Sequence, residues 1–410
     1  YKEIDGVKYK IDESTNTCKV TGYYGDSTEV VIANFYHDVP VTSIDDYAFK
    51  DAKNVERIII HDGINKIGRG AFYGCNSLEE VNIPYQVTIL EDDLFSYCYS
   101  LKEFIIPENI TKIGEFAFFK CTSLVNIQIP NSVTIIDESA FAECASLETI
   151  KIPDSVTTIG GNVFSGCTKL TSITIPDSVT TIGDYAFYGC SSLTSVTIGD
   201  NVTAIGRSAF TNCGKLANIN IGNSVMSIGS MAFFGCESLS SIAFPDSVTT
   251  IGDGAFSHCN NITEFKGKFT SIDGCCLIVN NVLISFINAN NTEYVIPDGV
   301  VRIGKRAFAG CECLTSIIIP NSVTSIGESA FRCCKNLTNV TIGNSVVEIE
   351  RNAFLSCKIE TMMCSAKIPP IISILPKRIK KFIVPFGSKE IYANSDWGMF
   401  IKIKNIQEIS

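Results

Sequence analysis

Several residue types on which function commonly depends are scarce in this sequence. Its 410 residues include only three histidines and a single tryptophan, Trp397. Basic residues are also few, with Lys+Arg 33 against Asp+Glu 43 and a net charge of −10. Nucleic acids and anionic lipid surfaces both require a positively charged footprint, so the charge argues against either as a partner. No apolar run reaches the roughly 18 residues of a membrane helix, and we expect no membrane insertion by this region.

The scarcity of histidine bears directly on catalysis. A nucleophile needs a nearby base and an exposed, electropositive setting. Only His37, His61 and His258 are present, and His258 is next to Cys259 in a turn where adjacent side chains should point in different directions. The sequence supplies no acid–base constellation, and its polar residues are spread evenly. We therefore expect no enzyme, no catalytic residue and no cofactor.

Cysteine, in contrast, is abundant, and most of it is periodic. Of 18 cysteines, twelve recur in the register of a 23-residue repeat, with one interruption. These register cysteines are Cys75, Cys98, Cys121, Cys144, Cys167, Cys190, Cys213, Cys236, Cys259, Cys311, Cys334 and Cys357. A period of this length is typical of leucine-rich repeats, in which each unit packs only on its neighbours.

One unit, LTSITIPDSVTTIGDYAFYGC from Leu170 to Cys190, predicts the fold of a coil. The alternation in SITI places Ile173 and Ile175 on one side of a short strand. Stacked strands of this kind form a parallel sheet with a continuous core. SVTTIG crosses the opposite side, and DYAFYGC reads as one helical turn. The predicted fold is a leucine-rich repeat solenoid with a parallel β-sheet on its concave face and short strands and helical turns opposite.

The repeat is interrupted between Phe256 and Phe308, where CCLIVNNVLISFI reads as an inserted β-hairpin that turns at Asn280-Asn281. Both ends of the chain also depart from the repeat, as capping segments should. The predicted domains are an N-terminal β cap (1–27), repeats (28–262), a hairpin island (263–292), repeats (293–364) and a C-terminal cap (365–410).

These segments resemble a known family. The unit LTSITIPDSVTTIGDYAFYGC is similar to the BspA-type leucine-rich repeat. Further segments resemble the flanking and island segments of gut and oral Bacteroidales members. They are YHDVPVTSIDDYAF, DGCCLIVNNVLISF with TEYVIPDGV, and FIVPFGSKEIYANSDWGMF. The resemblance implies a secreted or surface-anchored protein, with any signal or lipid anchor removed. It also implies adhesion to host matrix proteins such as fibronectin and fibrinogen, coaggregation and innate immune recognition.

Besides a catalytic nucleophile, three roles are possible for the register cysteines: disulfides, a metal site or packing. Stacked cysteines have a Cα spacing of about 4.8 Å that a disulfide permits, but their parallel side chains keep the Cβ atoms too far apart. A linear array does not converge on a metal ion. Packing as a small, buried hydrophobe is the favoured interpretation. The off-register cysteines are Cys18, Cys275, Cys276, Cys313, Cys333 and Cys364. A thiol cluster around Cys313 and Cys333 stays open, although incidental substitution is favoured and no metal site is predicted.

The concave sheet is the default binding surface of a solenoid. Its middle strands expose mainly Ser and Thr, which simply suit solvent-facing strands, whereas its N-terminal third mixes charged, amide and apolar side chains. The predicted binding residues are Arg57, Ile59, Glu80, Asn82, Glu103, Ile105, Asn126, Gln128 and Lys151. The hairpin at 275–287 is a rival site.

From these observations we expect a non-enzymatic, adhesin-like interaction protein, extracellular or at the cell surface. Its expected partners are host extracellular matrix or other surface proteins, and its oligomeric state stays open. The alternative is a glycan-binding or nutrient-capture surface module, which should carry exposed aromatic side chains for stacking on sugars. The two exposed columns of the concave sheet contain no aromatic residue.

Overall fold

A computed structural model describes residues 3–287, 292–376 and 379–409. Parts of three predicted domains lie outside these residues: 1–2 of the N-terminal cap, 288–291 of the island, and 377–378 and 410 of the C-terminal cap. The chain divides into two compact units, residues 1–225 and 226–410. Each unit is built from stacked coils whose strands pair mainly in parallel.

The first unit begins with an antiparallel cap. Its strands β1 (Glu3–Ile4), β2 (Val7–Asp12) and β3 (Thr17–Tyr23) pair antiparallel. The cap then turns into a parallel ladder, because β3 pairs in parallel with β6 (Val39–Ile44), which pairs in parallel with β8 (Lys66–Ile67). A short strand, β5 (Phe35–Tyr36), folds back antiparallel on β6.

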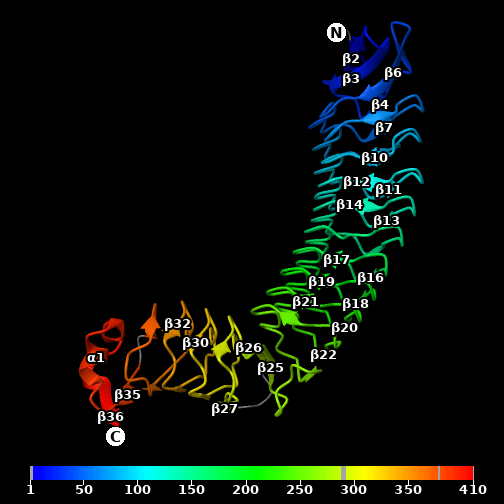
Figure 1. Ribbon diagram of the computed structural model, residues 1–410. Coiled ribbons are helices and arrows are strands. Elements are labelled where there is room, and N and C mark those ends of the chain that lie inside the picture. Colours follow the sequence, from blue (N-terminus) through cyan, green and yellow to red (C-terminus); the bar gives the residue numbers. More distant parts are fainter. Residues whose placement is uncertain (1–2, 288–291, 377–378, 410) are drawn as a thin grey trace. The chain divides into compact units, whose positions relative to one another are not determined.

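Two sides of each coil carry strands, which form a long ladder and a short ladder. In the long ladder of the first unit, alternate side chains are exposed and buried, as in β16, where Ser172 and Thr174 face solvent and Ile173 and Ile175 face the core. Its strands are β4 (Glu29–Val31), β7 (Arg57–Ile59), β9 (Glu80–Val81), β11 (Glu103–Ile105), β13 (Asn126–Gln128), β15 (Thr149–Lys151), β16 (Ser172–Ile175), β18 (Ser195–Ile198) and β20 (Asn218–Asn220). Figure 1 shows β7, β11, β13 and β16 following one another along the coils.

The short ladder uses two residues per coil, of which the second is buried. Its strands in the first unit are β10 (Ile89–Leu90), β12 (Lys112–Ile113), β14 (Ile135–Ile136), β17 (Thr181–Ile182) and β19 (Ala204–Ile205). Ile159 bridges β14 to β17 through single parallel pairs with Ile136 and Ile182. The register advances by one 23-residue repeat per coil, as in Glu103↔Asn126↔Thr149 of the long ladder.

The second unit repeats both ladders. Its long ladder comprises β22 (Ser241–Ala243), β24 (Glu264–Lys266), β27 (Glu293–Val295), β29 (Ser316–Ile319), β31 (Asn339–Ile342), β33 (Thr361–Cys364), β35 (Lys381–Pro385) and β36 (Ile406–Ile409). Its short ladder comprises β21 (Ser227–Ile228), β23 (Thr250–Ile251), β28 (Arg302–Ile303), β30 (Ser325–Ile326), β32 (Glu348–Ile349) and β34 (Ile371–Ile372). Parallel pairing therefore reaches into segments that the sequence assigned to the island, through β24, and to the C-terminal cap, through β35 and β36.

The interruption of the repeat contains a hairpin. Strands β25 (Cys276–Val279) and β26 (Val282–Phe286) pair antiparallel around Asn280 and Asn281, both of which have positive φ, as a two-residue hairpin turn requires. The hairpin is integrated into the coils, because β26 pairs in parallel with β28. Phe286 also enters the aromatic core, with its ring centroid 4.8 Å from that of Phe308.

The chain ends in short helical segments: α1 (Lys389–Ala393), η1 (Asp396–Met399) and η2 (Ile403–Asn405). Trp397 is buried in η1, where it stacks on Phe382 at 5.0 Å and donates its ring N–H to the Pro370 carbonyl at 2.8 Å. Throughout the part of the chain that is described, every helix is too short or too polar to cross a membrane.

The predicted helical turn in DYAFYGC is wrong. Tyr185 and Gly189 have φ of 58° and 73°, and the segment forms consecutive turns. The N–H groups of Tyr185, Phe187 and Gly189 donate to carbonyls of the next coil, each at 2.8 Å. Asp184, expected near the start of a helix, instead accepts from the Arg207 N–H of the next coil at 2.7 Å. Hydrogen bonding between coils thus replaces hydrogen bonding within a helix.

Phenylalanine rings form the centre of each stack of coils. In the first unit, the rings of Phe49, Phe72, Phe95, Phe118, Phe141, Phe164, Phe187 and Phe210 follow one another at centroid distances of 5.1–5.8 Å. The rings from Phe49 to Phe187 are fully buried. Such offset-stacked pairs contribute about 0.5–1.5 kcal/mol beyond the burial of their area.

Replacing Phe187 should therefore weaken the first unit strongly. Phe187→Ala removes a ring stacked on both sides, at 5.4 Å and 5.1 Å, and should lower the free energy of unfolding by about 3–5 kcal/mol. The neighbouring Tyr188 is 39% exposed, so Tyr188→Ala is a matched control with an expected change within about 0.5 kcal/mol. Urea unfolding followed by circular dichroism measures both. Equal losses in the two variants would contradict the ring stack as the main source of stability.

Candidate functional site

The long ladder of the first unit carries eight of the nine predicted binding residues, Asn82 directly follows β9, and all nine side chains are exposed. They stand in two rows on one face, which we call the strand face. One row runs through Arg57, Glu80, Glu103 and Asn126, and the other through Ile59, Asn82, Ile105, Gln128 and Lys151. The structure divides eight of them into two groups with different surroundings, and Ile59, which is 42% exposed, belongs to neither group.

The first group is occupied by interactions within the chain. Arg57 donates to Glu80 at 2.8 Å and to Glu29 at 2.9 Å, and the hydrogen bonds to Glu29 and Glu80 raise the pKa of its guanidinium. The Asn82 amide is paired with the backbone of Ile60, accepting from its N–H at 2.8 Å and donating to its carbonyl at 2.6 Å. These side chains therefore connect neighbouring coils. The sequence analysis did not identify Glu29, which lies in the first coil.

The second group lines a shallow hollow on the strand face. Glu103, Ile105, Asn126, Gln128 and Lys151 surround a volume of about 500 Å³, together with Thr149. Ile105 is 86% exposed, although it belongs to a strand of a packed ladder. The Thr149 hydroxyl donates to the Asn126 carboxamide oxygen at 3.1 Å. An apolar side chain surrounded by an acid, two amides and an amine is suited to noncovalent recognition.

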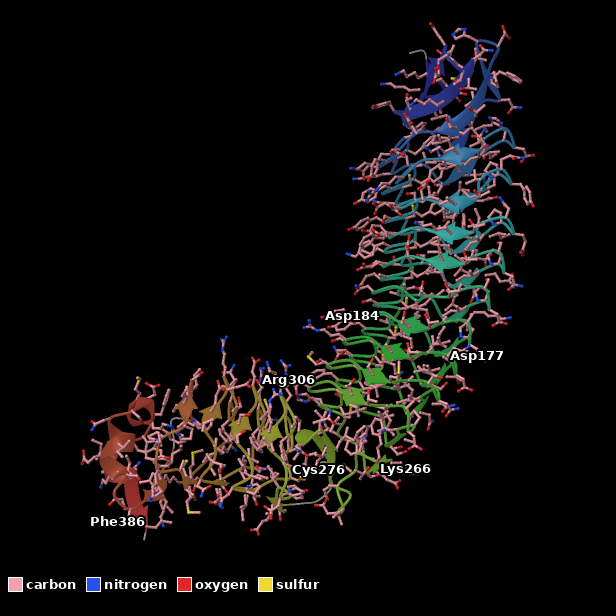
Figure 2. All side chains as sticks on the ribbon, in the orientation of Figure 1. Asp177, Asp184, Lys266, Cys276, Arg306 and Phe386 are labelled. Carbon is pink, nitrogen blue, oxygen red and sulfur yellow. The ribbon has the colours of Figure 1, made fainter. Side chains whose placement is uncertain are left out.

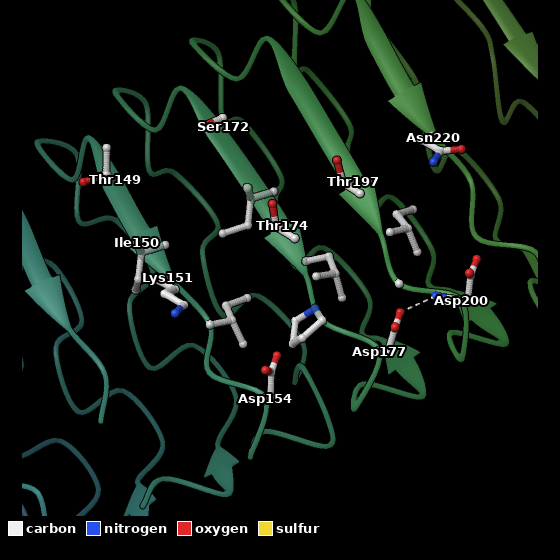
Figure 3. A pocket seen from close by; sticks show the side chains of 16 residues that line it. Thr149, Ile150, Lys151, Asp154, Ser172, Thr174, Asp177, Thr197, Asp200 and Asn220 are labelled. Atoms are coloured by element: carbon white, nitrogen blue, oxygen red, sulfur yellow. Dashed lines mark hydrogen bonds between the residues drawn. The ribbon is translucent and has the colours of Figure 1, made fainter. Parts of the chain in front are cut away.

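A larger hollow of about 560 Å³ continues along the same face between Thr149 and Asn220. Ser172, Thr174 and Thr197 form its floor, and Figure 3 shows Asp154, Asp177 and Asp200 along one rim. Asp177 accepts from the Asp200 N–H at 2.8 Å, and Asp200 accepts from the Asn223 N–H at 3.2 Å, so these two carboxylates also hold successive turns together. The sequence analysis did not predict a site here because the exposed rows are mainly Ser and Thr. The aspartate that recurs in the PDS and GDN turns could have indicated the acidic rim of the hollow.

The register cysteines are packing residues, as predicted, and they also make a specific contact. The thiols of Cys75, Cys98, Cys121, Cys144, Cys167, Cys190, Cys213, Cys259, Cys334 and Cys357 donate to a phenylalanine carbonyl of the preceding coil at 3.0–3.3 Å. Throughout the described residues the cysteines are thiols rather than disulfides. Cys275, Cys313, Cys333 and Cys357 are half-buried, and the others are buried.

The chemistry of the cysteines is that of buried thiols. Burial raises the pKa of Cys75, Cys213 and Cys259 to about 12, which opposes formation of a nucleophilic thiolate. His258, next to Cys259, has a lowered pKa because of burial and because of Arg332 and Arg306. Within the ranges that the structure describes, no three His, Cys, Asp or Glu side chains gather in a way that could hold a metal ion.

Two off-register cysteines instead contact buried tyrosines. Cys276 lies 3.1 Å from the Tyr294 hydroxyl, which donates to Asp273 at 2.8 Å. The Tyr392 hydroxyl lies 3.2 Å from the Cys364 sulfur and donates to the Ala366 carbonyl at 2.8 Å. Both thiols are buried, so these contacts fasten the hairpin and the C-terminal segment rather than forming a reactive centre.

Three features define a leucine-rich repeat solenoid: the 23-residue coil, the two parallel ladders, and the turns with their buried Phe and Cys. The chain belongs to the BspA type leucine rich repeat family, whose model matches residues 42–171, 157–281 and 284–385. No curated protein matches the sequence.

Solved structures show similar chains. A leucine-rich repeat protein from Bacteroides ovatus is 28% identical, with 100% of this chain and 99% of that chain covered and a TM-score of 0.68. A leucine rich cell surface protein from Faecalibacterium prausnitzii is 27% identical, with 100% and 94% covered and a TM-score of 0.47. The pneumococcal vaccine antigen PcpA is 16% identical, with 99% and 96% covered and a TM-score of 0.47.

The raised thiol pKa values predict how stability depends on pH. Unfolded cysteine ionises near pH 9.0, whereas Cys75, Cys213 and Cys259 ionise near pH 12 in the folded chain. Below about pH 9 the buried thiols make their full contribution to the free energy of unfolding. Between pH 9 and 12 only the thiols of the unfolded state ionise, and this ionisation lowers the free energy of unfolding. Urea midpoints measured from pH 7 to 11 should fall above pH 9.

The matched variant replaces Cys75, Cys213 and Cys259 with Ala. It should be less stable at pH 7, because three buried side chains are shortened, but its midpoint should fall less steeply above pH 9. A decline equally steep in both proteins would assign the pH dependence to other groups.

Proposed function

We propose that the protein is a non-enzymatic interaction module that acts outside the cell or at its surface and binds other proteins through the strand face. Leucine-rich repeat solenoids of its family are generally interaction modules without enzymatic activity. Proteins with BspA-like repeats are typically associated with the surface. Adhesion to host matrix or other surface proteins is the specific role proposed here.

The observation that carries this proposal is the exposed group around Ile105. An aliphatic side chain left 86% exposed in a packed ladder gains from burial against a partner, at roughly 25 cal/mol per Å² of apolar area removed from water. Glu103, Gln128 and Lys151 line the same hollow and would provide the polar rim of such an interface. The Arg57 cluster is already internally paired, and exposed ion pairs of this kind contribute little. We therefore place the contact at Ile105 rather than at Arg57.

Binding to immobilised fibronectin, fibrinogen and other matrix proteins tests the proposal, with a panel of complex glycans assayed in parallel. Ile105→Glu should weaken binding to a matrix protein at least tenfold, because it puts a carboxylate in the centre of the hollow. The matched control is Ile318→Glu, at the equivalent position of a repeat in the second unit, where the isoleucine is 42% exposed. It should bind like the unmodified protein.

Three results would count against the proposal. Matrix binding that Ile105→Glu leaves intact would remove the site from the strand face. Equal loss in both variants would indicate a diffuse charge effect. Binding to glycans with no binding to any protein would favour the alternative, a glycan-binding or nutrient-capture module.

A further inference from the structure

Charge is distributed unevenly along this chain. Residues 1–225 contain 16 Lys and Arg against 28 Asp and Glu, a net charge of −12, and residues 1–50 alone contain five against nine. Residues 365–410 contain eight basic residues against three acidic ones, a net charge of +5. The net charge of −10 therefore combines an acidic first unit with a basic C-terminal segment. Opposite charge in two parts of one chain points to electrostatic recognition.

The basic C-terminal segment also exposes large apolar side chains. Phe386 and Met399 are 78% and 77% exposed, and three isoleucines are 46–57% exposed. Helix α1 packs against both η1 and β36, so these residues belong to one layer. The Phe386 N–H donates to the Ile409 carbonyl at 2.9 Å, and Figure 2 shows Phe386 beside the C-terminal strand. We call this layer the C-terminal surface; it comprises Phe386, Ile391, Met399, Lys402, Ile403, Lys404 and Ile409.

The beginning of the first unit exposes apolar side chains next to acidic ones. Tyr24 is 72% exposed, Val31 57% and Phe35 62%. Asp26 and Asp38 are exposed beside them, and within the described residues neither takes part in an ion pair. The same holds for Lys402 and Lys404 of the C-terminal surface. We call this second surface the N-terminal surface; it comprises Tyr24, Asp26, Val31, Phe35 and Asp38.

The long ladder has an open edge at each of these surfaces. Strand β4 is an outer strand of the sheet β4-β7-β9, and β36 is an outer strand of the sheet that runs from β27 to β36. In the part of the chain that is described, each pairs on one side alone. Edge strands present unpaired N–H and C=O groups to which another chain can add. Both strands pair in parallel with their neighbours, so β36 and β4 have the polarity of successive strands in one ladder.

The charges select a second copy of this chain as the partner, and they select its orientation. Lysines of the C-terminal surface attract the carboxylates of the N-terminal surface, whereas two identical surfaces placed face to face repel each other. A head-to-tail contact is therefore favoured over a two-fold one. Head-to-tail contact is also the relation between successive coils within the chain, because each coil stacks on the one before it without reversing direction.

The apolar area on each surface suits a protein–protein contact. The exposed apolar side chains supply on the order of 400–600 Å² on each surface, a large part of the roughly 800 Å² that each partner buries in a stable interface. Single exposed apolar side chains are normal in a folded protein, but a group of this size marks an interaction surface. The lysines and carboxylates would form the polar rim of the interface.

We propose that the protein associates head to tail, with the C-terminal surface of one copy bound to the N-terminal surface of the next. The apolar side chains of the two surfaces pack together, and Lys402 and Lys404 face the carboxylates of the partner. Each copy keeps one unoccupied surface after a single contact, so copies add into open chains or close into a ring. Such chains display several copies of the strand face, which raises the avidity of any contact at Ile105.

Sedimentation velocity with two complementary variants tests this contact. Asp26→Lys with Phe35→Lys blocks the N-terminal surface, and Met399→Glu with Lys402→Glu blocks the C-terminal surface. Each variant alone should sediment as a monomer of 44.6 kDa. Their equimolar mixture should form a 1:1 complex of twice that mass, because each variant keeps the surface that the other lacks. The unmodified protein should grow beyond a dimer with concentration, and salt should weaken its association at least tenfold between about 0.05 and 0.5 M NaCl.

Two control variants place the same new charge outside both surfaces. Ile105→Glu and Lys169→Glu change exposed positions of the first unit and should associate like the unmodified protein. Urea midpoints close to that of the unmodified protein would verify that all variants fold, as expected for exposed positions. Ile105→Glu should lose matrix binding while it keeps self-association, so the strand-face proposal and this one can fail separately.

Three results would overturn the proposal. Unmodified protein that stays monomeric at low salt and high concentration would show that the two surfaces do not bind each other. A variant with one blocked surface that dimerises alone would reveal a two-fold contact between identical surfaces. Equal loss of association in Lys169→Glu and in the variant carrying Met399→Glu and Lys402→Glu would assign the effect to net charge rather than to the C-terminal surface.

Discussion

The coils depend on one contact that recurs between most successive coils: a thiol donating to the carbonyl of a stacked phenylalanine. The Phe72 carbonyl, for example, accepts from the Cys75 N–H of its own coil and from the Cys98 thiol of the next coil, both at 3.2 Å. The same phenylalanine places its ring 5.4 Å from that of Phe95. Ring stacking and thiol donation thus join successive coils at the same residue, and cysteine suits the position because it packs as an apolar side chain while still donating.

This shared interior leaves the outer surfaces of the coil available for variation. Ladder hydrogen bonds use the backbone, so the outward residues of the strand face can change without loss of the fold, from Ser172 in a plain region to Ile105 in the hollow. The turn segment offers a second such surface. There the two positive-φ positions hold glycine in some coils and Tyr97, Phe116 or Tyr185 in others, and the interior continues beneath them unchanged. The proposed recognition would therefore depend on rows of surface residues over a constant interior.

The periodic parts of the fold could be predicted from the sequence because one spacing determines them. The alternation of Ile173 and Ile175 predicted the long ladder, and the 23-residue step predicted its register. The turn around Tyr185 was mistaken for a helix because hydrogen bonds to the next coil compete with helical ones, and a single unit does not show that competition. Exposure of the nine predicted residues followed from alternation. The pairing of Arg57 with Glu29 did not, since it joins side chains of different coils.

The stacked interior depends most directly on the state of the cysteines. Reaction of the purified protein with a thiol reagent, without reductant and then in denaturant, measures that state. We predict that all 18 cysteines react once the chain is unfolded, and that only the half-buried Cys275, Cys313, Cys333 and Cys357 react readily in the native protein. Fewer than 18 reactive thiols in denaturant would reveal disulfides. Rapid reaction of Cys98 or Cys190 in the native protein would contradict a sealed interior of stacked Phe and Cys.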